Sequence, residues 1–296
     1  MKKIYIFLSI LVIFGVSFFL SYKLFIETNS TNNSSKRSDL ITPSEKKEPT
    51  ISAPVEEKKE ILIYDILGSS LKYPDTAMKK WRQDVVDLSK KYPSNLFING
   101  QANDKVVALT FDDGPDGVTT PRILNILKSN NIQATFFCVG NLIENNKSVI
   151  LQAYSDGNLI ESHSWSHKDF TTLNEASINN ELTLTENEIL KVIGKRPAII
   201  RLPYGSVNDT VENTLISYQY TSVLWSIDTL DWDQRQVDNI TKNVVNNVRP
   251  GEIILMHCDG DKKVTADALP GIINQLKEMG YGFVTLDKLL GCPAYK

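Results

Sequence analysis

Histidine is scarce in this chain, and two of the histidines are spaced so that they could bind one metal ion. The 296 residues contain three, His163, His167 and His257. The pattern His-x-x-x-His predicts a helical turn that presents the imidazoles of His163 and His167 on one face. With one carboxylate added, such a set leaves open positions for water and substrate, as a catalytic zinc site requires, and other divalent metals also suit it. The alternative is a pair of structural surface histidines.

Two adjacent carboxylates, Asp112 and Asp113, are the candidates for the third ligand. They follow a predicted strand, where neighbouring negative charges repel each other unless their roles differ. A metal ion separates the roles, because one carboxylate binds the ion and the other stays free to take a proton from water. The alternative is a solvated turn, since Asp-Gly-Pro is favourable turn chemistry.

Arg201 and His257 are further candidates, because each lies in or directly after an apolar strand. A buried arginine normally has a carboxylate partner, and Asp112 would stay ionised beside Arg201. A structural salt bridge elsewhere is the alternative. Asp231 could hold the second ring nitrogen of His257, which would raise the pKa of His257 and favour the imidazolium that a general acid needs. A hydrogen-bonded core histidine is the alternative for His257.

Alternating strand and helix patterns from about Lys105 predict the elements that position these residues. Repeated strand–helix units indicate a mostly parallel sheet with helices outside it, and seven or eight units favour a barrel over an open sheet. In such folds the chemistry lies at the carboxyl ends of the strands. The predicted strands are 106–110, 134–139, 159–161, 198–201, 220–226, 252–256 and 282–285. The predicted helices in this region are 121–129, 142–155, 175–193, 236–245 and 266–279.

The N-terminus predicts a membrane anchor, residues 1–26. Lys2 and Lys3 precede an apolar run, Ile4–Leu20, which is near the lower length limit for a spanning helix. No small-x-small cleavage site stands out after it, which favours an uncleaved signal anchor over a cleaved signal peptide. A buried core helix is the remaining alternative. The flanking lysines predict a single-pass protein of the cell membrane with an extracellular catalytic domain, or a secreted protein if the segment is cleaved.

Composition sets the other boundaries. Residues 27–60 are polar and predicted to be a disordered linker. Residues 61–104 are a predicted helical extension. Its helix, Thr76–Lys91, has one apolar face and should pack on the catalytic domain, residues 105–292; a separate binding module is the alternative.

The net charge of −3 lacks the basic footprint of a nucleic-acid-binding protein. The three cysteines show no CxxC spacing, which argues against a thiolate zinc site.

Five short motifs, in this order, resemble those of the NodB-homology polysaccharide deacetylases, carbohydrate esterase family 4. They are Thr110–Gly114, His163–His167, Arg201–Gly205, Asp228–Trp232 and Leu255–His257. Each motif alone is weak to moderate, but the ordered set is specific, and it covers about Lys105 to Leu289. The resemblance implies an α/β fold, the distorted (β/α) barrel of this family, here preceded by the transmembrane helix and linker.

The resemblance also implies a role for each catalytic residue. Asp112 matches the family's base, and Arg201 matches the residue that pairs with it. His257 matches the general acid, and Asp231 matches the carboxylate that tunes it.

Ligand and substrate residues follow from the same resemblance. The implied ligands of a divalent metal, usually Zn²⁺ and sometimes Co²⁺ or another ion, are Asp113, His163 and His167. Trp232 and Leu255 match the walls of a pocket for the acetyl methyl group. Tyr204 matches the residue whose backbone N–H helps to bind the oxyanion.

The expected reaction is hydrolysis of N-acetyl groups from a cell-wall polysaccharide with release of acetate. The outward topology favours N-acetylglucosamine or N-acetylmuramic acid units of peptidoglycan as substrates. The alternatives are a deacetylase of chitin oligomers or exopolysaccharide, and an O-acetyl esterase of the xylan type. A non-catalytic glycan-binding protein would lack a ligand or the base, and all are present here. The expected partners are the glycan and the membrane, not nucleic acid, and the protein is expected to be monomeric.

Overall fold

The structure, a computed structural model, describes residues 62–72, 74, 76–101 and 103–296. The predicted anchor, residues 1–26, and the predicted linker, residues 27–60, lie outside these residues. Within the described part of the chain, no helix combines the length and the apolar character needed to cross a bilayer.

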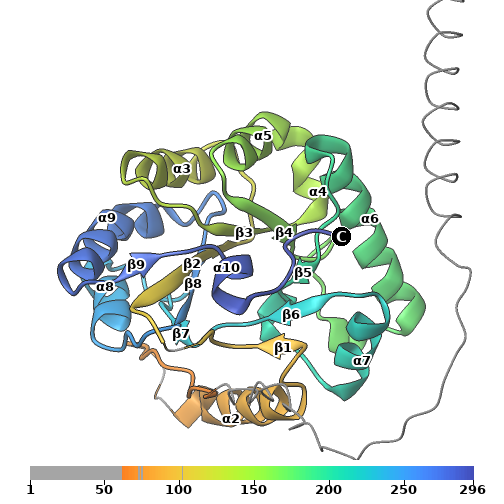
Figure 1. Cartoon of the computed structure of the whole chain (residues 1–296), viewed down its shortest axis with the longest axis horizontal. Coiled ribbons are helices and arrows are strands. Elements are labelled where there is room, and N and C mark those ends of the chain that lie inside the picture. The colour runs from red at the N-terminus through yellow and green to blue at the C-terminus, as the bar shows by residue number, and fades with distance from the viewer. Residues whose placement is uncertain (1–61, 73, 75, 102) are drawn as a thin grey trace, which may run out of the picture. The chain divides into compact units, whose positions relative to one another are not determined.

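Among the described residues, a sheet of nine strands forms the centre of the domain, and its strands pair in parallel (Figure 1). Eight of them follow the order β1-β6-β5-β4-β3-β2-β8-β7, and β9 pairs with the start of β2. The strands are β1 (Leu96–Phe97), β2 (Val106–Asp112), β3 (Thr135–Cys138), β4 (Leu159–Ser162), β5 (Ile199–Ile200), β6 (Thr221–Val223), β7 (Ile227–Asp228), β8 (Ile253–His257) and β9 (Gly282–Phe283).

The sheet curves into a half-barrel, which confirms the parallel α/β fold expected from the strand–helix pattern, whereas the expected barrel is only partly formed among the described residues. Its two edge strands are β1 and β7. Isolated bridges continue the pairing beyond these edges. Asn99, after β1, pairs with Glu252 before β8, and Leu67 pairs with Ile227 of β7. The chain that precedes the catalytic strands therefore contributes to the sheet.

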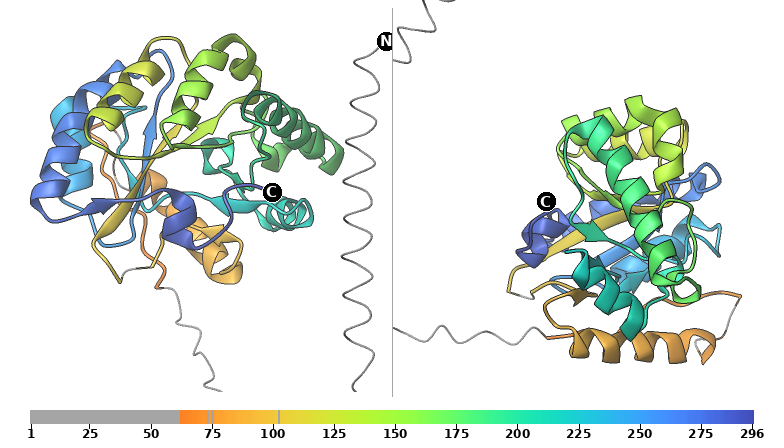
Figure 2. Two further views of the ribbon diagram at one scale, coloured as in Figure 1. Left: turned by 45° about the horizontal axis from the view of Figure 1, so that its top comes forward. Right: turned by 90° about the vertical axis from the view of Figure 1, so that its right-hand side faces the viewer.

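Most of the helices surround the sheet on its outer side, and the last helix, Leu286–Leu290, lies over the middle of the ring of strands (Figures 1 and 2). The helices are α2 (Thr76–Lys91), α3 (Thr119–Ser129), α4 (Gly140–Ile143), α5 (Lys147–Ser155), α6 (Glu175–Ile193), α7 (Asp209–Ser217), α8 (Val237–Val245), α9 (Lys263–Glu278) and α10 (Leu286–Leu290). The predicted helices Thr76–Lys91 and Glu175–Ile193 are confirmed to the residue. The predicted helix 142–155 is wrong as one continuous element, because a 3₁₀ turn, Glu144–Asn146, separates α4 from α5.

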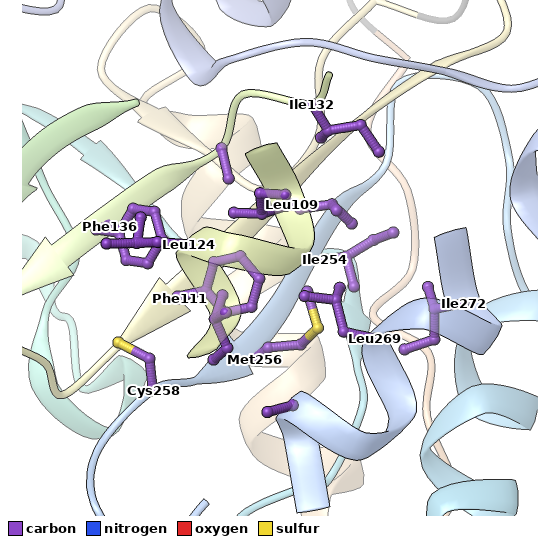
Figure 3. Close-up of a cluster of buried hydrophobic side chains, with 14 of the residues drawn as sticks. Leu109, Phe111, Leu124, Ile132, Phe136, Ile254, Met256, Cys258, Leu269 and Ile272 are labelled. Carbon is purple, nitrogen blue, oxygen red and sulfur yellow. The ribbon is translucent and has the colours of Figure 1, made fainter. Parts of the chain in front are cut away.

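Strand β2 contributes core residues to the outer face of the sheet and polar residues to the inner face. Successive side chains of a strand point to opposite faces. Leu109 and Phe111 pack outward against the helices, where Phe111 stacks on Phe136 with ring centroids 5.1 Å apart (Figure 3). Thr110 and Asp112 point inward, where both contact Arg201. Because β2 is buried on both faces, its sequence is a near-continuous apolar run that ends at Asp112.

Candidate active site

A cavity of about 430 Å³ lies where the carboxyl ends of the strands converge. All the predicted site residues line it except Arg201 and Asp231. These two lie behind the cavity wall, where they contact Asp112 and His257. The structure therefore brings together every side chain that the sequence analysis selected.

Asp113, His163 and His167 form a compact cluster whose ligand atoms all lie within 4.8 Å of one another. Oδ1 of Asp113 is 3.3 Å from Nε2 of His163 and 3.0 Å from Nε2 of His167. That oxygen is buried but lacks a partner with hydrogen-bond geometry. Burial disfavours the charged carboxylate, yet interactions with the two imidazoles hold the pKa of Asp113 well below its usual range. Two imidazole nitrogens around an ionised oxygen fit the donor set of a divalent metal.

The remaining nitrogens of the two histidines are held by the segment that follows β5. Nδ1 of His163 lies 2.8 Å from the carbonyl oxygen of Arg201. A carbonyl accepts hydrogen bonds only, so Nδ1 carries a proton; in the neutral ring, the form that binds a metal ion, Nε2 would have a free lone pair. Nδ1 of His167 lies 3.2 Å from the hydroxyl of Tyr204. Both rings therefore present Nε2 to Asp113.

The predicted helical turn at residues 163–167 is wrong. This segment is a loop, in which Ser164 and His167 adopt left-handed backbone conformations with φ of 67° and 55°. A helical turn satisfies its amide groups with carbonyl oxygens four residues earlier in the chain. Here the N–H of His167 donates instead to Oγ of Ser164. The two imidazoles meet because of this loop, not because of helical spacing.

A buried carboxylate on α6, Glu181, shapes the loop. Its Oε2 accepts hydrogen bonds from the backbone N–H groups of Trp165 and Ser166, at 2.9 and 2.8 Å. Its Oε1 accepts one from the hydroxyl of Ser166 at 2.7 Å. Glu181 was not among the predicted site residues, although an acidic residue on the apolar face of a predicted helix was a usable signal.

Asp112 is paired with Arg201, as the sequence suggested. Nη1 of Arg201 donates to Oδ1 of Asp112 at 2.8 Å and to Oγ1 of Thr110 at 2.7 Å. Nη2 and Nε donate to the carbonyl oxygens of Leu224 and Val223. The arginine is fully buried and donates these four hydrogen bonds, so Asp112 stays beside a fixed positive charge. The other oxygen of Asp112, Oδ2, lies 3.9 Å from Nε2 of His163 and so faces the cluster.

Asp231 holds His257 by two contacts, and the predicted pairing is present. Oδ1 of Asp231 lies 2.7 Å from Nδ1 of His257, and Oδ2 accepts the backbone N–H of His257. Thr265, a second residue that the sequence analysis missed, donates to the same Oδ2 at 2.6 Å. Burial lowers the pKa of His257, but the charge and hydrogen bond of Asp231, together with the charges of Asp113 and Asp112, raise this pKa to about 9.

Asp228 is a buried carboxyl group in the cavity wall. Its Oδ1 accepts hydrogen bonds from the N–H of Leu230 and from the indole Nε1 of Trp232, at 2.9 and 3.3 Å. Burial raises its pKa to about 6. Asp228 thereby sets the orientation of Trp232 at the rim of the cavity.

Comparison with known proteins identifies the family. A family model described as polysaccharide deacetylase matches residues 99–223. A peptidoglycan-N-acetylglucosamine deacetylase of Bacillus cereus is 38% identical over 193 residues, which are 64% of this chain and 70% of that protein. This chain belongs to the polysaccharide deacetylase family.

A second relative and a crystal structure support the same family assignment. The peptidoglycan-N-acetylmuramic acid deacetylase PdaC of Bacillus subtilis is 33% identical over 238 residues, 78% of this chain; the chain spans about half, 48%, of that relative's length. The crystal structure of the Bc1960 peptidoglycan N-acetylglucosamine deacetylase superimposes with a TM-score of 0.68 and 35% identity, covering 70% of this chain and 98% of that one. The protein is a polysaccharide deacetylase, a hydrolase with the parallel half-barrel of its relatives.

Replacement of Glu181 tests whether this carboxylate maintains the histidine loop of the deacetylase. Glu181→Ala leaves three donors of the loop without their acceptor, at a cost of about 1–3 kcal/mol. Chemical denaturation should show this loss in the free energy of unfolding. Asn180→Ala, at an exposed position of the same helix, is the control and should change it by less than about 0.5 kcal/mol. Equal effects of the two changes would show that Glu181 does not support the loop.

Proposed function

We propose that this deacetylase hydrolyses N-acetyl groups of peptidoglycan, using a divalent metal ion held by Asp113, His163 and His167. The proposal rests on one observation, which is that the adjacent carboxylates Asp112 and Asp113 contact different groups. Asp113 meets the two imidazoles, and Asp112 is engaged by Arg201. Zn²⁺ is the favoured ion because a set of two histidines and one carboxylate is typical of catalytic zinc, and Co²⁺ or another divalent ion suits the same ligands.

A bound ion would supply Lewis-acid activation of water and of the acyl oxygen. The side chains then move the protons. Asp112, paired with Arg201, takes a proton from the water whose oxygen attacks the carbonyl carbon. His257, protonated below about pH 9, donates a proton to the nitrogen as the C–N bond breaks. Acetate and a free amino sugar result.

The walls of the cavity would orient the acetyl group. Trp232 and Leu255 both line the cavity, and in this proposal they enclose the methyl group. The backbone N–H of Tyr204 would donate to the developing oxyanion, where a preorganised donor stabilises the transition state more than the ground state. These roles rest on the match to the family motifs and on the shared cavity.

Acetate release from defined substrates tests the proposed function. Peptidoglycan should release acetate, while chitin oligomers and acetylated xylan should release less. A chelator should abolish release, and added Zn²⁺ or Co²⁺ should restore it, because the bound ion would supply the Lewis-acid activation of water and of the acyl oxygen. Full activity in protein shown by elemental analysis to be metal-free would refute the metal-dependent reaction. Faster release from chitin or xylan would reassign the substrate, and no release from any of them would leave the glycan-binding alternative.

The roles of the neighbouring carboxylates can be separated by mutation. Asp113→Ala should weaken metal binding, since it removes one of three ligands. Asp112→Asn should retain the metal and lower the rate of acetate release by roughly 100- to 10,000-fold, the usual cost of losing a general base. Elemental analysis and initial rates measure both. Loss of metal from Asp112→Asn with retention by Asp113→Ala would reverse the assignment.

The pH dependence reports on His257. A general acid must be protonated, so kcat/KM should fall as the pH rises through the His257 pKa of about 9. Asp231→Asn removes the negative charge that raises this pKa, so the alkaline limb should move to lower pH, toward about 6.5. Rates measured across the pH range at saturating metal provide the test. An alkaline limb that is the same in both proteins would exclude His257 as the acid.

We also propose that the protein is anchored in the cell membrane with its catalytic domain outside. Support comes from the apolar run Ile4–Leu20 behind two lysines and from a substrate that lies outside the cell. Protease added to intact cells or spheroplasts should digest the catalytic domain. Protection of the domain until the membrane is lysed would contradict this topology.

A further inference from the structure

Helix α2 bridges the open side of the half-barrel. Leu67, which precedes it, exchanges backbone hydrogen bonds with Ser226 and Asp228 at the β7 edge. The strand that follows it, β1, forms the opposite edge. Figures 1 and 2 show α2 lying beneath this region. Val85 and Val86 of α2 are buried in the same apolar cluster as Leu255 of the cavity wall. Helix α2 is therefore built into the catalytic unit, although the family match begins only at residue 99.

Two side chains of α2, Met78 and Trp81, line the catalytic cavity. They are three residues apart and so lie on one face of the helix. Leu202 and Trp225 line the cavity too, and the indole of Trp225 packs against that of Trp81 with ring centroids 5.3 Å apart. This part of the lining is apolar, whereas the carboxylates and imidazoles provide the polar part.

Trp81 has a second contact that limits how it can be tested. Its Nε1 donates to the carbonyl oxygen of Gly205 at 3.2 Å. Gly205 has a φ of +61°, and a Cβ there would lie 2.6 Å from Cζ2 of Trp81. Helix α2 therefore packs directly against the turn that contains Tyr204. Replacement of Trp81 would disturb that turn, so Met78, which has a half-buried side chain, is the better probe.

We propose that Met78 and Trp81 form the wall that contacts the sugar ring of the substrate, which makes α2 a specificity-determining part of the active site. The inference rests on the proposed function. The acyl carbonyl must reach the polar groups, and its methyl group is assigned to Trp232 and Leu255. A cavity of about 430 Å³ falls in the range of roughly 300–1,000 Å³ that holds whole small ligands. The sugar ring therefore extends along the remaining wall, and its apolar C–H face matches a thioether and an indole.

Substrate binding to a slowly reacting variant tests the contact of Met78 with the sugar separately from the hydrolysis step. N-Acetylglucosamine tetramer is titrated by calorimetry into zinc-loaded Asp112→Asn protein, with and without Met78→Ala. Met78→Ala should weaken binding about tenfold, as expected for the loss of a buried apolar contact. Met78→Leu, which conserves volume, should restore most of the affinity. Lys79→Ala, at the exposed neighbouring position, is the control and should bind as the parent does.

In otherwise unmodified enzyme, Met78→Ala should raise KM about tenfold and leave kcat, metal content and melting temperature close to those of Lys79→Ala. If the Asp112→Asn parent binds the tetramer and Met78→Ala binds as tightly as Lys79→Ala, α2 only packs against the domain and the inference is overturned. If the parent does not bind and the unmodified enzyme releases no acetate from any glycan, the proposed function fails, and the inference fails with it.

Discussion

The positive charge of Arg201, enclosed inside the half-barrel, is the constraint on which the rest of the site depends. A buried charge costs several kcal/mol unless it is paired and hydrogen-bonded. For Arg201 this cost is offset by hydrogen bonds to the carboxylate of Asp112, the hydroxyl of Thr110 and two carbonyl oxygens. These acceptors come from the end of β2 and from the chain at and after β6. One side chain thus joins the strand ends that surround the cavity.

The backbone of the same residue contributes to the neighbouring cluster. The carbonyl oxygen of Arg201 holds His163, and three residues later Tyr204 reaches His167. Tyr204 does so from a left-handed conformation with a φ of 61°. Such a backbone costs of order 1–3 kcal/mol and persists only where surrounding contacts maintain it. Here the packing of α2 against Gly205 supplies part of that support.

Asp112 and Asp113 can differ in role because the chain changes conformation between them. Asp112 ends β2 with its side chain turned inward to Arg201. Asp113 has a φ of 68°, which breaks the alternation of the strand and lets its carboxylate meet the two histidines. Neighbouring carboxylates would repel each other in an extended strand, but here Asp112 is paired with Arg201 and Asp113 is turned toward the two imidazoles.

Patterns local in sequence predicted much of this molecule. The apolar face of α6 and the apolar run of β2 were visible, and so was the pairing of Asp112 with Arg201, because buried charges need partners. The histidine loop was not predictable from spacing, since Glu181, which shapes it, lies on a separate helix. Helix α7 was missed because Glu212 and Thr214 are buried within it and interrupt its apolar pattern. That α2 reaches the cavity depends on how it packs, which periodicity does not specify.

Anomalous diffraction from crystals soaked in Zn²⁺ tests the central claim, the separation of two adjacent carboxylates by Arg201 and a metal. The account predicts one strong peak about 2.0–2.2 Å from an Asp113 oxygen and from Nε2 of both His163 and His167, with Asp112 still hydrogen-bonded to Arg201. A peak ligated by Asp112 with Arg201 released, or no peak at these three residues, would contradict it.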